Sequence, residues 1–178
     1  MLQITEHIGL KPITEVDATA LFTLMNEVYT AAYKHFWKDQ GNGYIQRQYG
    51  AENIVKELRE EQTAYYFIVV NEEVVGNFRV LWNRELLGFP HKKSAKLHRL
   101  YLHPKSHGQG IGKTLMNWLE NTAKERRYDL IWLDAMDAQP KAFQFYENLG
   151  YQYHSHCLLD FKELYDAFRK MSQLYKEL

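Results

Sequence analysis

Three glycines at alternate positions, Gly108, Gly110 and Gly112, constrain this chain more than any other feature of its sequence. They lie between an expected strand that Pro104 ends and the start of an expected helix. A glycine backbone can adopt dihedral angles that other residues avoid and can approach a ligand closely, while the free N–H groups of a helix start attract anions. The segment therefore predicts an α/β fold with a loop that binds a pyrophosphate.

Two other phosphate-binding motifs fit this loop less well. A dinucleotide-binding fingerprint needs a glycine at position 113, which is Lys113 here. A P-loop needs a glycine at the position of His107, although Leu130 to Asp134 resembles the strand that carries a Walker B acid. The loop also comes late in a short chain, which leaves few elements to follow it. A P-loop-like nucleotide-binding protein is therefore the alternative interpretation.

The composition predicts one globular domain over residues 1–178. Hydrophobic residues make up 46% of the chain, and 22 acidic residues balance 22 basic residues, so no excess positive charge favours nucleic-acid binding. Cys157 is the only cysteine, which excludes an internal disulfide and a cysteine zinc cluster. The N-terminus lacks the apolar region of a signal peptide, and no apolar run is long enough to cross a membrane. We therefore expect a cytoplasmic protein with no membrane or nucleic-acid partner.

Hydrophobic spacing predicts the secondary structure. Apolar residues at helical spacing indicate helices, and short runs of β-branched and aromatic residues indicate strands. Thr14 and Asp17 resemble a capping box at the start of the first helix, and Gly150 is expected to end the last one. Loops are expected near 41–43, 71–73 and 83–94, and residues 160–178 fit either a helix or a last strand. In chain order we expect a strand over 7–13, helices over 14–31 and 51–61, strands over 65–70, 74–81 and 96–103, a helix over 110–123, a strand over 128–133, a helix over 142–149 and a strand from 151.

The glycine loop and a second motif together resemble the GNAT N-acetyltransferase superfamily. The first signature of that superfamily, Gln/Arg-x-x-Gly-x-Gly/Ala after a strand that ends in apolar-x-Pro, corresponds here to Leu102-His103-Pro104 and to His107 through Gly112. The second signature, Asn-x-x-Ala-x-x-Phe-Tyr-x-x-x-Gly-Phe, corresponds to Gln139, Ala142, Phe145-Tyr146-Glu147, Gly150 and Tyr151. His107 and Gln139 replace the usual Gln or Arg and the usual Asn.

The resemblance implies a fold and an activity. The implied fold is a mixed central sheet of about six to seven strands flanked by about four helices, in the order β-α-α-β-β-β-α-β-α-β-β, with a final strand near 168–175. The implied reaction is transfer of acetyl from acetyl-coenzyme A to a primary amine by direct attack, without a metal. The amine would belong to a small molecule, a polyamine-like compound, a protein or a peptide, and the chain is loosely similar to small-amine and polyamine acetyltransferases. Many members of the superfamily are homodimers, so a homodimer is possible here.

The resemblance also assigns residues to the coenzyme and to the chemistry. The backbone N–H of Leu102 is expected to stabilise the oxyanion, and Tyr146 to protonate the departing thiolate. An alkyl amine has a pKa of roughly 10.4 and must lose a proton before attack, for which His98 is the expected base. The residues expected to bind the coenzyme are Leu100, Tyr101, Leu102, His107, Gly108, Gln109, Gly110, Ile111, Gly112, Lys113, Gln139 and Tyr146.

Several other residues have weaker functional interpretations. Asp134 and Asp137 could attract a cationic amine, and Lys113 and Lys141 could meet coenzyme phosphates. His154 and His156 alternate on an expected strand and would share one face, but no third ligand stands at a recognisable spacing, so we expect no metal. Acceptor specificity is expected to reside in residues 14–63 and 83–94, where four aromatic residues are interpreted mainly as packing: Tyr33, Phe36, Trp37 and Tyr44. A non-catalytic acyl-coenzyme A sensor of the same fold is a further alternative.

Overall fold

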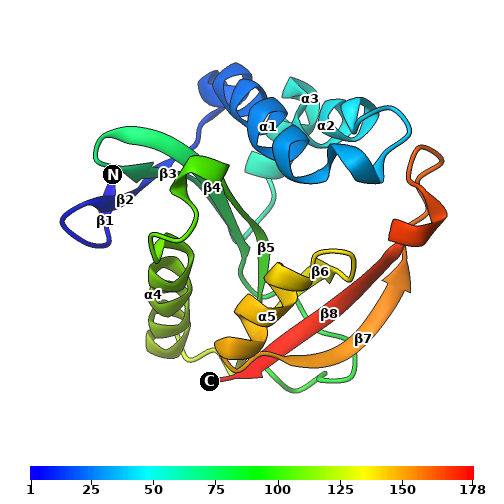
Figure 1. The fold of residues 1–178 in the computed structure, drawn as a ribbon. Coiled ribbons are helices and arrows are strands. Elements are labelled where there is room, and N and C mark those ends of the chain that lie inside the picture. The colour runs from blue at the N-terminus through cyan, green and yellow to red at the C-terminus, as the bar shows by residue number, and fades with distance from the viewer.

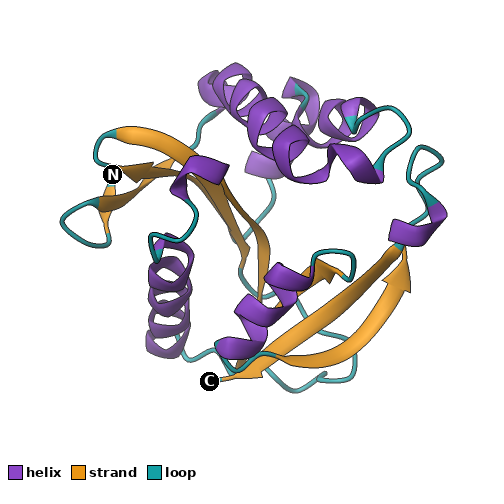
Figure 2. Cartoon of the chain, viewed as in Figure 1, coloured by secondary structure: helices purple, strands orange, loops and turns teal.

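Eight strands form one mixed sheet in a computed structural model that describes residues 1–178 (Figures 1 and 2). The order across the sheet is β1-β2-β3-β4-β5-β6-β8-β7, and all neighbours are antiparallel except β5 and β6. The strands are β1 Leu2–Gln3, β2 Ile8–Pro12, β3 Thr63–Val70, β4 Glu73–Leu81, β5 Ser94–Leu102, β6 Leu130–Met136, β7 Gln152–Leu158 and β8 Lys170–Glu177. The five helices are α1 Ala18–Tyr33, α2 Asn42–Tyr49, α3 Ala51–Leu58, α4 Ile111–Glu125 and α5 Pro140–Asn148.

This arrangement confirms the expected mixed α/β fold and corrects its element count. The sheet has one strand more than the six to seven expected, because the two residues of β1 are too few to give a sequence pattern. The chain also has five helices rather than about four, because α2 begins at Asn42, within a region expected to be a loop. Gly41 precedes α2 with a φ of 86°, so this glycine marks a helix start instead of a long loop.

Local signals set several boundaries correctly. The backbone N–H of Thr14 donates a 2.9 Å hydrogen bond to Asp17 Oδ2, which confirms the interaction expected at the start of the first helical segment. The turn between β3 and β4 consists of Asn71 and Glu72, with φ values of 47° and 70°. Two successive residues at positive φ match the twist of a tight hairpin, so Glu73 already belongs to β4.

Helices cover the sheet on both faces and form two separate cores (Figure 1). On one face, α4 contributes Leu115 and Leu119 to a core that also contacts α5. On the other face, α1 contributes Leu21 and Met25 to a core that also includes residues of α2 and α3. Burial of apolar surface on both faces makes this sheet a rigid support for side chains at its edges and gaps.

The sheet opens between β5 and β6. These two strands pair only from Ser94 opposite Leu130 to Leu97 opposite Leu133, although both strands continue further. On the other side of β5, a register shift pairs Arg79 with Arg99 and Val80 with Leu97, which leaves His98 as the extra residue of a β-bulge. The unpaired end of β5 therefore faces an opening in the sheet.

The C-terminal segment resolves as a strand. β8 lies between β6 and β7 and pairs with both, which confirms the expected final strand; the strand begins at Lys170, after a short 3-10 helix over Asp166–Phe168. A second register shift, between Tyr153 and Ser155, leaves His154 unpaired in β7. His154 Nε2 lies 2.7 Å from the carbonyl of Leu87, whereas His156 Nδ1 lies 2.7 Å from the hydroxyl of Tyr153. The expected shared face of the two histidines is therefore wrong, because the bulge breaks the alternation of the strand.

None of the five helices combines the length and the apolar character needed to cross a lipid bilayer.

Candidate functional site

The glycine loop between β5 and α4 has the geometry expected of a site where a ligand meets bare backbone. Gly108 and Gly110 both have a φ of 76°, a value that side-chain-bearing residues rarely adopt. A Cβ atom built on either residue would meet nothing within 4 Å, so both face open space. Gly112 has a different role, because a Cβ there would lie 3.3 Å from the ring of Phe145 and would crowd the contact between α4 and α5.

A groove of about 700 Å³ runs along this loop, between the end of β5 and α5, and we call it the glycine-loop groove. It contains most of the residues expected to bind the coenzyme, and it also contains Lys141. Tyr101 lies outside the groove and packs with the core of α1 to α3, and the side chain of Gln109 donates to the carbonyl of Lys105 at 3.0 Å. The expected residues that line the groove are Leu100, Leu102, His107, Gly108, Gly110, Ile111, Gly112, Lys113, Gln139 and Tyr146.

The two residues that depart from the superfamily signatures make contacts of their own. His107 Nε2 lies 3.1 Å from the carbonyl of Leu102, so this histidine ties the glycine loop to the end of β5. Gln139 Nε2 donates to the carbonyl of Ala32 at 3.2 Å and thereby ties the start of α5 to the end of α1. Both residues still line the glycine-loop groove.

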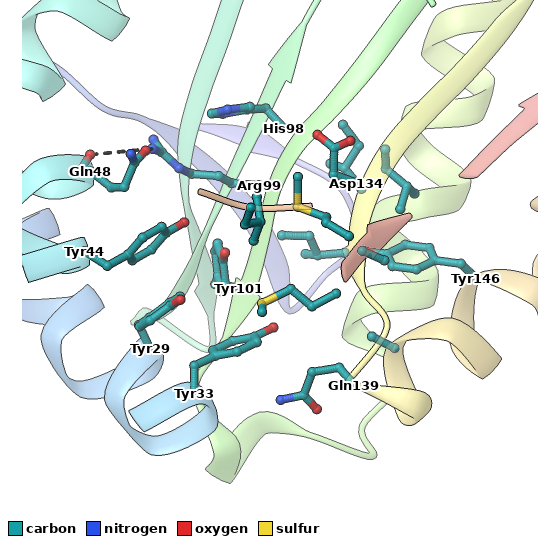
Figure 3. A pocket seen from close by; sticks show the side chains of 18 of the residues that line it. Tyr29, Tyr33, Tyr44, Gln48, His98, Arg99, Tyr101, Asp134, Gln139 and Tyr146 are labelled. Carbon is teal, nitrogen blue, oxygen red and sulfur yellow. Dashed lines mark hydrogen bonds between the residues drawn. The ribbon is translucent and has the colours of Figure 1, made fainter. Parts of the chain in front are cut away.

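A second cavity, of about 290 Å³, lies where β5 and β6 separate, and we call it the tyrosine cavity (Figure 3). α1 and α2 close one side of it, and Leu159 and Phe161 of the loop between β7 and β8 close another. Three of the four aromatic residues interpreted as packing, namely Tyr33, Trp37 and Tyr44, line this cavity. The residues labelled in Figure 3 are Tyr29, Tyr33, Tyr44, Gln48, His98, Arg99, Tyr101, Asp134, Gln139 and Tyr146.

The two cavities adjoin. Five residues line both of them: Tyr33, Leu100, Gln139, Ala142 and Tyr146. A ligand in the glycine-loop groove and a ligand in the tyrosine cavity would therefore meet at this shared wall. No residue of the segment 83–94 lines the tyrosine cavity, so the expectation that this loop contributes to acceptor specificity finds no support in the structure.

Free backbone N–H groups of β5 face the same junction. The N–H of His103 donates to the carbonyl of Val75 in β4 at 2.7 Å. Because successive backbone groups of a strand point to opposite sides, the N–H groups of Leu100 and Leu102 point away from β4, towards β6. The pairing with β6 has already ended at Leu97, so neither group has a strand partner there.

Tyr146 lies on α5 at the junction of the two cavities. Its ring packs edge-to-face against Phe145 and Tyr151, with centroid distances of 5.0 and 5.9 Å. Desolvation by burial raises the pKa of Tyr146 above its ordinary value of 10.0. The hydroxyl is therefore protonated at neutral pH and available as a proton donor.

His98 is held in a neutral state at the bulge of β5. Arg79 Nη1 lies 2.9 Å from His98 Nδ1, and since a guanidinium only donates, Nδ1 is the acceptor and Nε2 carries the hydrogen. Desolvation by burial, together with the nearby charges of Arg99 and Arg79, lowers the pKa of His98 to about 2. This environment makes His98 a weak base.

A buried ion cluster that the sequence patterns did not indicate supports the tyrosine cavity. Arg79, Arg99 and Glu57 are 1%, 4% and 6% exposed. Glu57 accepts hydrogen bonds from Arg99 through both carboxylate oxygens, and its Oε1 lies 3.1 Å from Arg79 Nη1. Arg79 also pairs with Glu60 at 2.9 Å. The sequence signal that could have revealed this cluster is the presence of Arg79 and Arg99 among the apolar residues of β4 and β5.

The acidic candidates after β6 are separated by the structure. Asp134 lines the tyrosine cavity, but its Oδ2 lies 2.5 Å from Lys96 Nζ. Asp137 lies outside that cavity and pairs with Lys170 at 2.8 Å and with Ser172 at 2.7 Å. Only Asp134 is therefore placed to influence a ligand in the tyrosine cavity.

Comparison with known proteins identifies the family and the fold. A family model described as the Acetyltransferase (GNAT) family matches residues 20–151 of this chain. A spermidine N-acetyltransferase from Vibrio cholerae is 16% identical, with a TM-score of 0.68 over 97% of this chain and 95% of that one. The PaiA N-acetyltransferase from Thermoplasma acidophilum, solved with coenzyme A, is 18% identical, with a TM-score of 0.69 over 96% and 99%. RimL, a ribosomal alpha-N-protein acetyltransferase solved with coenzyme A, is 14% identical, with a TM-score of 0.71 over 99% and 97%. The match over most of the chain shows that this protein belongs to the GNAT family of acetyltransferases.

Proposed function

We propose that this protein transfers an acetyl group from acetyl-coenzyme A to a primary amine by direct attack. The observation that carries the proposal is the shared wall of the glycine-loop groove and the tyrosine cavity, where Tyr146 and the backbone of Leu100 are both accessible. Such a junction lets two bound substrates touch without a covalent enzyme intermediate, because each has a cavity of its own.

The glycine-loop groove fits a coenzyme A pyrophosphate. Gly108 and Gly110 leave open space in front of the N-terminus of α4, whose free N–H groups favour an anion. Lys113 and Lys141 are exposed along the groove and would add positive charge near the phosphates. When bound, acetyl-coenzyme A supplies the acetyl group as a thioester.

We assign the oxyanion donor to the backbone N–H of Leu100. This residue lies two positions before Leu102 in β5, whose N–H was the donor expected from the sequence. Both N–H groups point into the opening of the sheet, but Leu100 lines both cavities and Leu102 lines only the glycine-loop groove. A donor must reach the carbonyl oxygen at the point where the amine attacks, and that point lies at the junction. Leu102 would then hold the pantetheine arm along the end of β5.

Tyr146 serves in this proposal as the general acid. Its raised pKa keeps the phenol protonated, and its position at the junction of the two cavities supports a role as proton donor to the departing sulfur. The amine nitrogen first bonds to the carbonyl carbon, which gives the tetrahedral oxyanion, and the C–S bond then breaks. The phenol proton passes to the sulfur, and the proton that the amine nitrogen releases restores the phenol.

His98 is a poor candidate for the base in this arrangement. With Nδ1 occupied by Arg79 and its pKa lowered to about 2, His98 does not take a proton from an ammonium group near neutral pH. We propose instead that the amine enters as its neutral form and leaves the ammonium proton in solvent. The Nε2–H of His98 can then donate to an ordered water, while the lone pair of the amine nitrogen stays free to attack.

Two measurements test the proposed reaction. Acetyl-coenzyme A should raise the melting temperature, and a primary amine should then trigger release of free thiol. The Tyr146→Phe variant separates catalysis from the sensor alternative, because it should keep coenzyme binding and lose turnover. Binding without turnover across a broad amine panel would favour the sensor instead. Stabilisation by ATP with magnesium, in place of acetyl-coenzyme A, would favour the P-loop alternative, which the family assignment leaves without support.

A further inference from the structure

We propose that the acceptor is a small primary monoamine with an aromatic or other apolar body, and that diamines and polyamines are poor acceptors. This inference rests on the acetyl transfer proposed above and concerns the tyrosine cavity alone. It would set this chain apart from the spermidine N-acetyltransferase that shares its fold.

The first argument is that every charged group in the wall of the tyrosine cavity already has a partner. Arg99 forms a two-pronged ion pair with Glu57, and both side chains are more than nine-tenths buried. His98 is neutral because burial and the neighbouring arginines lower its pKa. Asp134 is the only carboxylate in the wall, and it pairs with Lys96. The cavity therefore carries no net negative charge for a second ammonium group.

The second argument is that Asp134 is held firmly in its pair. Lys96 Nζ approaches Asp134 Oδ2 at 2.5 Å and lies 4.2 Å from the ring centroid of Trp132, so packing and charge hold the ammonium in one place. Gln173 Nε2 donates to the other carboxylate oxygen at 3.3 Å. The side chains of Lys96 and Asp134 are only 15% and 20% exposed. A substrate ammonium would have to displace Lys96, which leaves that lysine partly buried without a counter-ion.

The third argument is the aromatic wall. Tyr29 stacks on Tyr33 and on Tyr44, each at a centroid distance of 4.6 Å, and Tyr101 meets Tyr29 and Tyr33 edge-on at 6.0 and 6.1 Å. Figure 3 shows these rings on one side of the cavity and Tyr146 on the other. Burial raises the pKa of all four phenols, so none contributes a negative charge. Such walls favour a flat or apolar substrate body.

The fourth argument is the closure of the cavity by the β7–β8 loop (residues 159–169). Phe161 of this loop packs against Trp37 and Tyr44 at centroid distances of 5.6 and 5.9 Å. Main-chain hydrogen bonds from Lys38 to Glu163 and from Tyr165 to Phe36, of 2.7 and 3.0 Å, fasten the loop to the segment after α1. The cavity, of about 290 Å³, suits a small free amine.

A matched pair of amines tests the inference. Pentylamine and cadaverine differ only in the second amino group, and phenethylamine adds an aromatic body. We expect kcat/KM, measured by thiol release, to be highest for phenethylamine and roughly 100-fold lower for cadaverine than for pentylamine, because the second ammonium is desolvated without a partner. Phe161→Ala should lower kcat/KM for phenethylamine at least about tenfold through lost ring contacts. Lys162→Ala, an exposed neighbour in the same loop, is the control.

The outcomes separate this inference from the proposed reaction. Cadaverine or spermidine turned over as well as pentylamine or better would overturn the monoamine inference and leave acetyl transfer intact. Coenzyme binding without acetylation of any amine, shown by a raised melting temperature and no thiol release, would instead defeat the proposed reaction and this inference with it.

Discussion

Replacing His98 with glutamine should make the protein more resistant to acid while leaving its activity nearly unchanged. The glutamine carbonyl can accept the hydrogen bond that Arg79 now donates to Nδ1, so the bulge of β5 keeps its contact. Histidine, however, takes up a proton when the chain unfolds below pH 6.5, because its pKa in the folded protein is about 2. Stability that is complete above pH 6.5 is therefore lost as the pH falls towards 2, and glutamine has no such proton to gain.

The size of this effect follows from the two pKa values. Each pH unit between them costs about 1.36 kcal/mol of unfolding free energy, so a change from pH 7 to pH 5 costs wild type about 2 kcal/mol that His98→Gln does not lose. All other titrating groups are common to both proteins and cancel in the comparison. His91→Gln, at an exposed loop position, serves as the control for the substitution itself.

Urea titrations of the three proteins at pH 7 and pH 5 measure the difference directly. Equal acid sensitivity of wild type and His98→Gln would refute the argument that the bulge holds this histidine neutral. Steady-state kinetics add a second check, because kcat/KM should rise about tenfold per pH unit below the amine pKa in both proteins. A loss of about 100-fold or more in kcat/KM on substitution would restore His98 as the base.

Three further perturbations test other parts of the molecule. Tyr146→Phe should lower kcat about 100-fold or more without changing the Kd of acetyl-coenzyme A, as compared by single-turnover and binding assays. Gly110→Val should cost roughly 1–2 kcal/mol in backbone strain and weaken coenzyme binding in calorimetry, whereas Gly88→Val, at a φ of 94° outside the groove, should bring strain with unchanged affinity. Glu57→Gln should lower the unfolding free energy by about 3–5 kcal/mol, since it removes the carboxylate that pairs with the buried Arg99 and one of the two that pair with Arg79. Glu163→Gln, in an exposed pair, should cost at most about 1 kcal/mol. Equal urea midpoints for the two glutamate variants would contradict the importance of the buried cluster.

The parts of this structure that were predictable from sequence are those governed by local rules. Alternate glycines at 108, 110 and 112 indicated a loop whose backbone is accessible to a ligand. Two of them, Gly108 and Gly110, have the positive φ that only glycine adopts easily. Hydrophobic spacing located α4 and β6 to within a few residues. These features depend on neighbours in the chain, so the chain itself displays them.

The parts that were missed depend on tertiary contacts. No local pattern shows that His98 occupies a bulge, because a bulge is defined by the partner strand. The burial that lowers its pKa exists only in the folded sheet, and pairing of β4 with β5 brings the charge of Arg79 beside it. The position of Tyr44 in the cavity likewise depends on α2, a helix that the sequence did not reveal because Gly41 and Gly43 indicated a loop. The catalytic and coenzyme-binding roles, the cytoplasmic location and the possible homodimer stay predictions.

Main-chain hydrogen bonds hold the β7–β8 loop against the segment after α1, so segments near both ends of the chain meet at the tyrosine cavity. Segments near the start and the end of the chain add one side of the tyrosine cavity to the wall formed by β5, β6 and α5, while the middle third supplies the glycine loop for the pyrophosphate. Acceptor preference can therefore change through the two ends of the chain, whereas the residues shared by both cavities tie part of the amine site to the coenzyme. Replacing α1, α2 and the β7–β8 loop with those of a relative should shift the amine preference towards that of the relative and leave coenzyme binding unchanged.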